Sequence, residues 1–577
     1  MAYNFLRKIV FSVLLTGLPI VGWSASTLFR NGVTNYNIIL CPGASASETT
    51  AATELADYLN QISGARFAVQ SQPTKGHNYI YIGYDSFVGR TLGARQPADG
   101  DEGFRIVTRN GNLFIYGGRT RGTMYGVYRF LDEQLGVRWY AKDFVRVPKR
   151  KTFTLGKIDE SQSPAFPYRC VLYYTSLHNI DWNGHNLVNS IMGTSGETKY
   201  GGYQGYVGVH TMTSFVSKDK YFKSHPEYFA LRDGKRIDNG QLCLSNPNVV
   251  KLLIASTLDY IKQYPGCWCY SVSQDDNVLF CQCKKCTALE KKYGGHSGLL
   301  LWAVNQIADA VKAKYPDVMI GTLAYHATQT PPKNIVPRPN VKIRLCTVEC
   351  CMSRPLTDKV NATFYNDLMG WKKLTNNLVI WAYPTNFYHY LMPFPAMDSE
   401  AENMRLYRKL NLQGCMEMGQ YDAYGGEFFE LKQWMFAKLL WNPSDNPDSL
   451  AHDFIYGFYG KAADNVMQYY NLTKQLGEKD LFYFETRYDT PFYTDDYLKT
   501  SRRLLDDALE KVKGNATIYS NVEKLRVSIL YLQSMRNPAA AVADGDAALL
   551  KQFVNKYKWE EREGRSYTEF INKINGW

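Results

Sequence analysis

The sequence lacks the short motifs that mark several common classes of enzyme. It contains no His-Glu-x-x-His pattern, no nucleophile elbow and no phosphate-binding loop, so it gives no support for peptidase, esterase or nucleotide chemistry. It also lacks a basic tract, because the Lys and Arg residues behind its formal charge of +12 are scattered along the chain. We therefore expect no nucleic-acid partner, although a mildly basic surface tolerates acidic ligands.

Long hydrophobic runs are absent except near the amino terminus. There, Arg7 and Lys8 precede an apolar run over residues 9–21. This run is too short to span a bilayer, so we interpret residues 1–25 as a signal peptide that is removed on export. No Cys ends the run, and Cys41 lies too far along the chain to carry a lipid. The sequence thus predicts an exported soluble protein, periplasmic or secreted, without a lipoprotein anchor or an integral membrane span.

The length of 577 residues allows two to four domains, and the sequence pattern changes twice after the signal peptide. Residues 26–160 mix strand and helix patterns, including a capping box that starts at Ser45 and an Asn-Gly hairpin signal at Asn110. Because no catalytic spacing occurs there, we interpret this part as a small α/β accessory domain. Residues 446–577 carry helical patterns and predict a helical carboxyl-terminal domain.

Between these two parts, residues 161–445 alternate short apolar strands with helical patterns. Eight such strands fit a (β/α)8 barrel of the TIM type. Barrels of this type carry their chemistry at the carboxyl ends of the strands, so the residues that follow each strand are candidates for function. The predicted strands are residues 168–173, 187–192, 206–210, 267–273, 318–325, 341–348, 378–383 and 413–418.

The fourth predicted strand ends in two adjacent carboxylates, Asp275 and Asp276. Neighbouring residues at a strand end point to different sides, so one carboxylate can reach a leaving group while the other meets a second part of a substrate. Two carboxylates a few Å apart also push their pKa values apart, so that one stays ionised while the other holds a proton. Glycoside hydrolysis needs this division of roles. The alternative is a strand end capped by solvated, turn-forming residues.

Two further carboxylates at predicted strand ends are candidate catalytic residues. Glu349 follows the sixth strand, and Glu417 ends the eighth between two Met residues, where burial would raise its pKa and suit it to donate a proton. The alternative for Glu417 is a buried ion pair with a Lys or Arg. Other polar and aromatic side chains near strand ends are candidates for substrate binding, since aromatic rings stack on sugar faces while polar groups meet hydroxyls. These candidates are His210, Asn277, Tyr325, His326, Tyr383, Asn386 and Glu427.

The chain has 12 Cys residues, and three of them, Cys281, Cys283 and Cys286, directly follow the acidic strand end. In an exported protein such clustering favours structural disulfides or free thiols. Zinc is the alternative, with His296 as a fourth ligand beside the three Cys residues. A catalytic Cys is disfavoured, and we expect neither a metal nor another cofactor.

The predicted barrel also carries a set of short stretches that are specific when taken together. They are residues 225–231, 234–236, 241–247, 271–277, 323–325, 331–333 and 344–346. Through them the barrel resembles the domain of unknown function 4838, which is grouped as glycoside hydrolase family 163. The first domain is similar to the amino-terminal domain of α-glucuronidases and β-hexosaminidases, through a helix at residues 47–62 and the Gly-Gly-Arg-Thr sequence at residues 117–120.

The resemblance implies an endo-β-N-acetylglucosaminidase that cleaves the chitobiose core of complex N-glycans, with a glycan or glycoprotein as its partner. It also implies a substrate-assisted retaining mechanism, in which the 2-acetamido carbonyl attacks the anomeric carbon of its own sugar. Asp275 and Asp276 would then polarise the amide nitrogen and protonate the leaving oxygen, with Glu349 and Glu417 as rivals for the acid. The family carries Asn where Asp275 stands, which makes Asp276 the firmer assignment. The alternatives are another exo- or endo-glycosidase, specific for uronic acids or hexosamines, and a catalytically silent glycan-binding protein.

Overall fold

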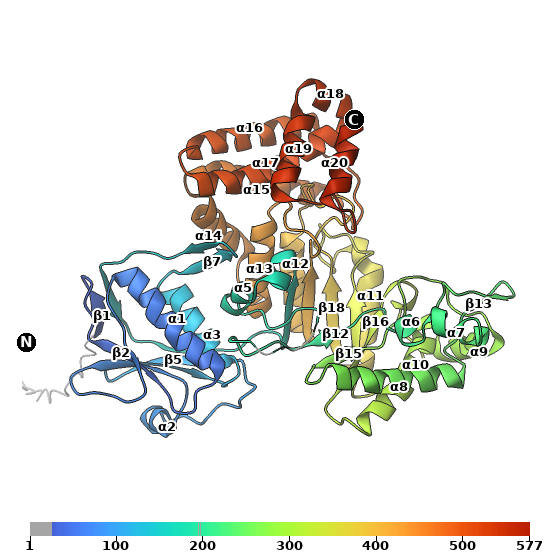
Figure 1. Cartoon of the computed structure of the whole chain (residues 1–577), viewed down its shortest axis with the longest axis horizontal. Coiled ribbons are helices and arrows are strands. Elements are labelled where there is room, and N and C mark those ends of the chain that lie inside the picture. The colour runs from blue at the N-terminus through green and yellow to red at the C-terminus, as the bar shows by residue number, and fades with distance from the viewer. Residues whose placement is uncertain (1–25, 194–195, 197) are drawn as a thin grey trace, which may run out of the picture.

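The computed structural model of the chain describes residues 26–193, 196 and 198–577 (Figure 1). The predicted signal peptide, residues 1–25, lies outside the described residues. In Figure 1 the first region, coloured blue, lies beside a central parallel sheet, and the red helices of the carboxyl-terminal part lie at the top of the view. None of the described helices combines the length and the apolarity that a bilayer span requires.

The first region contains a mixed sheet with helices packed on it. Its elements are β1 (Ser26–Arg30), β2 (Tyr36–Leu40), α1 (Ala46–Ser63), β3 (Val69–Gln70), β4 (Asn78–Ile82), α2 (Ser86–Leu92), β5 (Phe104–Arg109), β6 (Asn112–Gly117), α3 (Gly122–Arg129), β7 (Arg138–Ala141), β8 (Phe144–Arg146), β9 (Thr152–Leu155) and β10 (Asp159–Gln162). The main sheet has the order β10-β5-β6-β4-β2-β3. The predicted capping box is confirmed, because the side chain of Ser45 accepts from the backbone of Glu48 at the start of α1. The predicted hairpin is confirmed as well, since β5 and β6 pair antiparallel around Asn110 and Gly111, both at positive φ.

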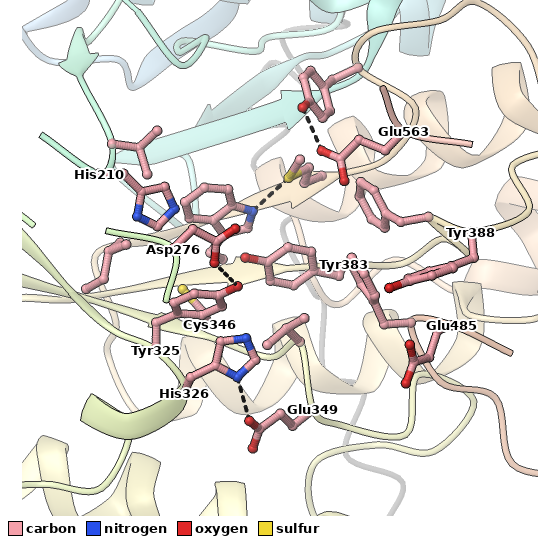
Figure 2. Close-up of a pocket in the computed structure, with 18 of the residues that line it drawn as sticks. His210, Asp276, Tyr325, His326, Cys346, Glu349, Tyr383, Tyr388, Glu485 and Glu563 are labelled. Carbon is pink, nitrogen blue, oxygen red and sulfur yellow. Dashed lines mark hydrogen bonds and ion pairs between the residues drawn. The ribbon is translucent and has the colours of Figure 1, made fainter. Parts of the chain in front are cut away.

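The central part of the chain forms a curled sheet of parallel strands. They are β11 (Tyr168–Leu172), β12 (Tyr206–Val207), β15 (Cys269–Ser271), β16 (Met319–Ala324), β17 (Val341–Cys346), β18 (Leu378–Ala382) and β19 (Gly414–Met418). Their order is β11-β19-β18-β17-β16-β15-β12, and every neighbouring pair is parallel. Seven of the eight predicted strands are therefore present at their predicted places, and their carboxyl ends lie around the cavity that Figure 2 shows.

The predicted second strand, residues 187–192, is the exception. It is reduced to one parallel bridge between Ser190 and Cys170. The side chain of Asn189 takes the place of a main-chain partner, because its Oδ1 accepts from the backbone N–H of Arg169 at 2.9 Å. The described residues thus form a seven-stranded half-barrel, and the closed eight-stranded barrel of the prediction is not confirmed.

The segments between these strands are mostly helical, as the sequence predicts. The elements are α4 (Tyr174–His178), α5 (Ile180–His185), α6 (Met212–Phe215), α7 (Lys218–Tyr221), β13 (Leu231–Arg232), β14 (Lys235–Arg236), α8 (Pro247–Gln263), α9 (Lys284–Tyr293), α10 (His296–Lys312), α11 (Ala362–Leu374), α12 (Met397–Lys409) and α13 (Phe429–Trp441). Helices α8, α10, α11 and α12 agree with the helical patterns that the sequence carries at residues 249–264, 299–314, 363–374 and 398–410. Helix α9, which begins after Cys283, was not predicted.

The part of the chain after residue 446 is helical, as predicted. Its helices are α14 (Pro447–Tyr459), α15 (Ala463–Lys479), α16 (Asp495–Val512), α17 (Ala516–Arg536), α18 (Pro538–Ala543), α19 (Asp546–Tyr557) and α20 (Tyr567–Asn575). Their buried side chains belong to the same hydrophobic cluster as those of the central sheet, whereas the first region has a core of its own. The carboxyl-terminal helices are thus continuous with the core beneath the cavity.

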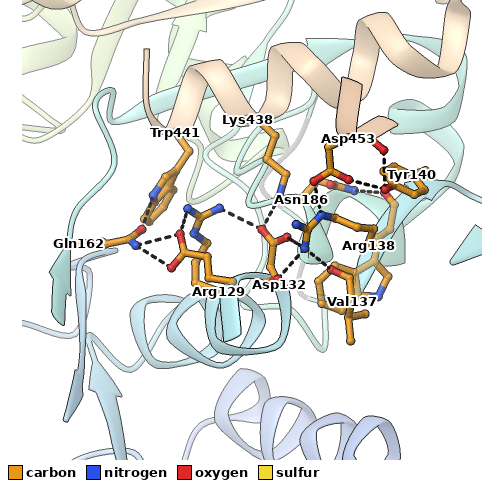
Figure 3. A network of polar contacts seen from close by, with 12 residues as sticks. Arg129, Asp132, Val137, Arg138, Tyr140, Gln162, Asn186, Lys438, Trp441 and Asp453 are labelled. Atoms are coloured by element: carbon orange, nitrogen blue, oxygen red, sulfur yellow. Dashed lines mark hydrogen bonds and ion pairs between the residues drawn. The ribbon is translucent and has the colours of Figure 1, made fainter. Parts of the chain in front are cut away.

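A network of buried charges joins the first region to the central part (Figure 3). Asp132 lies just after α3, where its carboxylate accepts from Arg129 at 3.0 Å and from Arg138 at 2.6 Å. Lys438 of α13 adds a third ion pair. Burial disfavours the charge on Asp132, but these three cations outweigh that cost and lower its pKa. The first region is therefore fastened to a helix of the central part rather than loosely tethered.

Candidate active site

A cavity of about 940 Å³ opens at the carboxyl ends of the central strands (Figure 2). Its size falls within the range of small-ligand sites, and its lining combines aromatic, polar and acidic side chains. Six of the predicted site residues line the cavity: His210, Asp276, Tyr325, His326, Glu349 and Tyr383. The five predicted residues outside its lining are Asp275, Asn277, Asn386, Glu417 and Glu427.

The acidic end of the fourth predicted strand lies at this cavity. The chain bends at Asp276, so the two neighbouring carboxylates separate. Asp276 reaches the cavity, where the hydroxyl of Tyr325 donates to its Oδ1 at 2.9 Å. Asp275 instead accepts from the hydroxyl of Thr213 at 2.5 Å. Burial raises the pKa of Asp275, and the negative charge of Asp276 adds to the rise.

The loop that carries these carboxylates, residues 275–277, is held by Gln241. The side-chain amide of Gln241 donates to the carbonyl oxygens of Asp275 and Asn277, at 2.9 and 2.8 Å. Its Oε1 accepts from the backbone N–H of Asp275 at 3.0 Å. Asn277 shapes the same turn, because its Oδ1 accepts from the backbone N–H of Leu279 at 3.0 Å. The place of Asp276 therefore depends on a segment that lies earlier in the chain.

A His–carboxylate pair borders the cavity near Asp276. Nδ1 of His326 lies 2.6 Å from Oε1 of Glu349, and both side chains are exposed in part. The ring of His326 contacts that of Tyr325, with centroids 4.0 Å apart. Glu349 thus faces the cavity from a solvated position and has an imidazole as its partner.

His210 follows β12 and lines the cavity as one defined tautomer. Its Nδ1 lies 2.7 Å from the carbonyl oxygen of Gln274, which can only accept, so Nδ1 carries a proton. In the neutral ring Nε2 is then an acceptor. The backbone of His210 is left-handed, with φ of 51°, and its N–H donates to the hydroxyl of Ser273 at 2.9 Å. His210 is therefore a fixed polar group that suits a substrate hydroxyl.

Aromatic side chains form a wall of the cavity. Trp381 of β18 stacks on Tyr383, with ring centroids 5.6 Å apart and planes 7° from parallel. Phe387 and Phe484 stack at 4.6 Å, and Tyr383 meets each of them edge-on. Flat apolar rings beside polar groups suit the C–H faces of sugar rings.

The helical carboxyl-terminal part contributes cavity residues that the sequence analysis missed. Glu485 and Glu563, from two loops between helices, line the cavity together with Arg562. Backbone hydrogen bonds attach both loops to the segment after β18. The N–H of Phe387 donates to the carbonyl of Phe484, and the N–H of Glu563 donates to the carbonyl of Phe387, both at 3.1 Å. These residues follow helices rather than strands, so the rule that function lies at strand ends does not predict them.

Glu563 is a cavity carboxylate with a raised pKa. The hydroxyl of Tyr421 donates to its Oε1 at 2.6 Å. Partial burial raises the pKa of Glu563, and the charges of Asp422 and Asp276 add to the rise. The cavity therefore brings Asp276 and Glu563 into electrostatic range of each other, which suits acid–base chemistry.

Glu417 does not line the cavity, which corrects the prediction made from the end of β19. Side chains alternate along a strand, and the next residue, Met418, lines the cavity, so Glu417 points to the opposite face. There it is fully buried and accepts from the thiol of Cys415 at 2.9 Å. Burial raises its pKa well above the usual value, and the charge of Glu400 on α12 adds to the rise. The predicted high pKa is present, but the sheet separates Glu417 from a ligand in the cavity.

Two predicted binding residues also occupy buried positions outside the cavity. Glu427 is 1% exposed and forms an ion pair with Lys432 at 3.1 Å. Asn386 is 1% exposed, and its amide donates to the carbonyl of Thr486 at 2.6 Å while its Oδ1 accepts from two backbone N–H groups. Asn386 thus fastens one of the carboxyl-terminal loops to the segment after β18 and does not itself face the cavity.

Comparison with solved structures shows that this fold is one found in glycoside hydrolases. A family GH115 4-O-methyl-α-glucuronidase, BtGH115A, with specificity for decorated arabinogalactans, superposes with a TM-score of 0.62 at 11% identity, covering 95% of this chain and 78% of that one. At such low identity the likeness concerns the fold alone. A GH138 enzyme targeting pectin rhamnogalacturonan II has a TM-score of 0.48 at 11% identity, with 94% and 98% coverage. The chitobiase FjGH20 of Flavobacterium johnsoniae has a TM-score of 0.45 at 14% identity, with 96% and 97% coverage. The last two likenesses are too weak to carry an argument.

Two sequence families match the chain. Residues 139–471, more than half of the 577 residues, match the domain of unknown function DUF4838, and the chain belongs to this family. Residues 33–130 match the family described as glycosyl hydrolase family 67 N-terminus. No curated protein matches the sequence. The resemblance of the barrel to domain 4838 is thus confirmed, whereas its grouping in glycoside hydrolase family 163 stays a prediction.

Proposed function

We propose that this protein is a glycoside hydrolase of family 163, an endo-β-N-acetylglucosaminidase that cleaves the chitobiose core of complex N-glycans. The observation that carries the proposal is Asp276, a strand-end carboxylate that reaches a cavity of about 940 Å³ beside an aromatic wall. The glycoside hydrolase fold and the family 67 match of the first region support the reaction class. The choice of bond rests on the resemblance to family 163.

In the proposed reaction the substrate supplies its own nucleophile. The carbonyl oxygen of the 2-acetamido group bonds to the anomeric carbon, while the bond from that carbon to the leaving oxygen breaks. Asp276 gives its proton to the leaving oxygen, and the glycan remains as a cyclic oxazolinium ion. Asp276 then takes a proton from the water that attacks the anomeric carbon. The ring opens, the acetamido group is restored and the configuration is retained.

Neighbouring residues would orient the proton of Asp276 and the acetamido group of the substrate. The hydroxyl of Tyr325 donates to Oδ1 of Asp276, so the proton for the leaving group belongs on Oδ2. Asp275 lies outside the cavity lining, and its role as partner of the acetamido N–H rests on the resemblance to family 163. Its oxygens keep accepting capacity beyond the bond from Thr213. The sugar ring would pack against the aromatic wall that includes Trp381 and Tyr383.

A screen of released products tests the proposed bond. The purified protein is incubated with glycoproteins that carry complex N-glycans, and mass spectrometry follows both the released glycan and the peptide. We expect free glycans that end in one GlcNAc and peptides that keep the other. Removal of single terminal sugars would contradict the endo assignment, and the absence of any sugar release from a broad glycan panel would contradict the reaction class.

A glycosidase that acts on uronic acids is the second candidate, and Arg562 is the observation that favours it. Arg562 lines the cavity, where a guanidinium would pair with a sugar carboxylate. The GH115 structure that shares the fold is itself a glucuronidase. A double displacement on such a substrate would need two carboxyl groups about 5 Å apart. Adding glucuronate-decorated polysaccharides to the screen separates the candidates, because Arg562→Met should raise KM for an acidic substrate only.

We also propose, from the sequence alone, that the protein is exported after removal of residues 1–25. Mass spectrometry of the mature protein should find a new amino terminus between about Gly22 and Thr27. An intact Met1 in the soluble fraction would rule this out.

A further inference from the structure

Four cysteines from two separate segments meet outside the cavity. Cys243 lies between β14 and α8, while Cys281, Cys283 and Cys286 lie between the acidic loop and the first turn of α9. Their four Sγ atoms all lie within 4.8 Å of one another. The Sγ of Cys243 is 3.7 Å from that of Cys283 and 3.9 Å from that of Cys286. We refer to these residues as the four-cysteine cluster.

The distances within the four-cysteine cluster fit four thiolates around one metal ion. Zinc bonds thiolate sulfur at about 2.3 Å in a tetrahedron, so the sulfur atoms of such a site lie about 3.8 Å apart. A disulfide needs a separation of about 2.05 Å, and all 12 Cys residues, which fall within the described ranges, are free. The sequence analysis allowed disulfides or free thiols here, and the structure has free thiols.

The surroundings of the cluster supply the donors that thiolate ligands need. The backbone N–H of Leu231 lies 3.3 Å from Sγ of Cys281, and that of Cys286 lies 3.5 Å from Sγ of Cys283. Arg236 of β14 directs a guanidinium nitrogen to Sγ of Cys281 at 3.7 Å. Four thiolates around a divalent ion leave a net negative charge, which N–H donors and a cation stabilise.

We propose that the four-cysteine cluster binds one zinc ion in a closed, structural site. The sequence offered His296 as the fourth ligand, but that ring pairs with Glu290 at 2.7 Å and stacks on Phe280 at 4.3 Å. Cys243, far from the other three in sequence, takes this place. Four protein ligands leave no open coordination position, so the ion has no direct part in the chemistry of a substrate.

The position of the cluster makes it a brace for the loop that carries Asp276. Gln241, which binds the backbone of residues 275–277, lies two residues before Cys243. Cys281 lies just after the same loop in the chain. One ion would therefore join the segment that holds the loop to the segment that follows it, and would fix Asp276 without contacting it.

Metal analysis of the full-length mature protein tests the site directly. The protein is purified without chelator, zinc is measured against protein concentration by mass spectrometry, and alkylation of the unfolded chain separates free from disulfide-bonded thiols. We expect one zinc per chain and no disulfide within the four-cysteine cluster. Cobalt added to the metal-free protein should give the charge-transfer and ligand-field bands of a tetrahedral sulfur site. Disulfides within the cluster, or no zinc bound above background after incubation with zinc chloride, would overturn the proposal.

Single substitutions assign the metal to these cysteines. Cys243→Ser should lose most of the bound zinc, whereas Cys41→Ser, at a buried cysteine of the first region, should keep one zinc per chain. Cys283→Ala, at the most accessible corner of the cluster, gives the same measurement where Cys243→Ser does not fold. Full zinc content in either cluster variant would contradict the assignment.

The zinc content is measured without a substrate, so the test of the metal site does not depend on the proposed reaction. If the ion braces the loop that carries Asp276, slow removal of zinc should lower the Tm. Zinc should then restore the Tm more fully than other divalent ions at the same concentration. An unchanged Tm after complete removal of the ion would leave a metal site without the proposed bracing role and would count against this part of the inference.

Discussion

Asp276 and Glu417 give the same signal in the sequence but occupy opposite sides of the sheet. Each is an acidic residue at the carboxyl end of a strand in the same parallel sheet. Asp276 lies beyond its strand, in a bend, and lines the cavity. Glu417 lies within β19, one residue before the cavity-lining Met418, and is buried on the other face. The difference teaches that within a strand the alternation of side chains decides whether an acid faces the cavity, whereas beyond the strand the path of the loop decides it.

The largest expected effect is the loss of turnover in Asp276→Asn. An amide cannot give a proton to a sugar leaving group, so we expect kcat for glycan release to fall on the order of a hundredfold or more. Tyr325 can still donate to the amide oxygen, so the Tm should stay close to that of the wild type. Steady-state kinetics on the glycoprotein found by the screen measure the change. A folded Asp276→Asn variant with near wild-type release would move the acid role to Glu349 or Glu563.

A smaller loss is expected for Asp275→Asn. The amide oxygen can still accept the acetamido N–H, but the negative charge that stabilises the oxazolinium ion is gone. We expect kcat to fall by roughly tenfold with little change in KM. Thr213→Val, which removes the hydroxyl bonded to Asp275, is the matched control and should have the milder effect. A rise in KM with unchanged kcat would assign Asp275 to binding instead.

Glu563→Gln should change the pH profile more than the maximal rate. Burial raises the pKa of Glu563, and the charges of Asp422 and Asp276 add to the rise. Gln does not ionise, so the limb of the kcat/KM profile that reports Glu563 should be lost in the variant. Tyr421→Phe keeps the carboxyl but removes a hydrogen bond that lowers its pKa, so this limb should move to higher pH. A Glu563→Gln profile that matches the wild type would contradict a role of Glu563 in the reaction.

The smallest effect on activity is expected for Glu417→Gln, which should instead change stability. Burial raises the pKa of Glu417 well above its usual value and that of Glu400 to about 7. A raised pKa stabilises the folded state at low pH, and this contribution is lost as the pH rises through the raised value. Gln stays neutral, so the free energy of unfolding of the variant should match that of the wild type near pH 5 and exceed it near pH 9. Urea titrations at both pH values measure this, and a higher stability at pH 5 only would contradict it.

Much of the central sheet could be predicted from the sequence because its strands are buried on both faces. Such strands read as short apolar runs, as in residues 378–382. The predicted strand at residues 187–192 failed for a local reason. The side-chain oxygen of Asn189, rather than a main-chain carbonyl, accepts the hydrogen bond from the N–H of Arg169. The pattern of apolar residues gives no sign of this exchange.

The sequence predicted only those site residues that the strand ends of the parallel sheet bring together. Parallel strands end at one edge of a sheet, which is why Asp276 and Tyr325 could be placed together from the sequence. Glu485 and Glu563 come from loops between helices, and their path depends on packing that no local pattern encodes. Cys243 was missed because it belongs to a different segment from the other three cysteines of its cluster, and only the fold brings these segments together.

The most direct test of the account is whether a leaving group that needs no proton rescues Asp276→Asn. The glycan that the wild-type protein releases is presented as its dinitrophenyl glycoside, and kcat of Asp276→Asn and Glu417→Gln is measured on it and on the glycoprotein. The account predicts that the loss in Asp276→Asn shrinks to less than about tenfold on the aryl glycoside, while Glu417→Gln stays near wild type on both substrates. Equal losses of Asp276→Asn on both substrates, or rescue of Glu417→Gln instead, would contradict the claim that Asp276 delivers the proton.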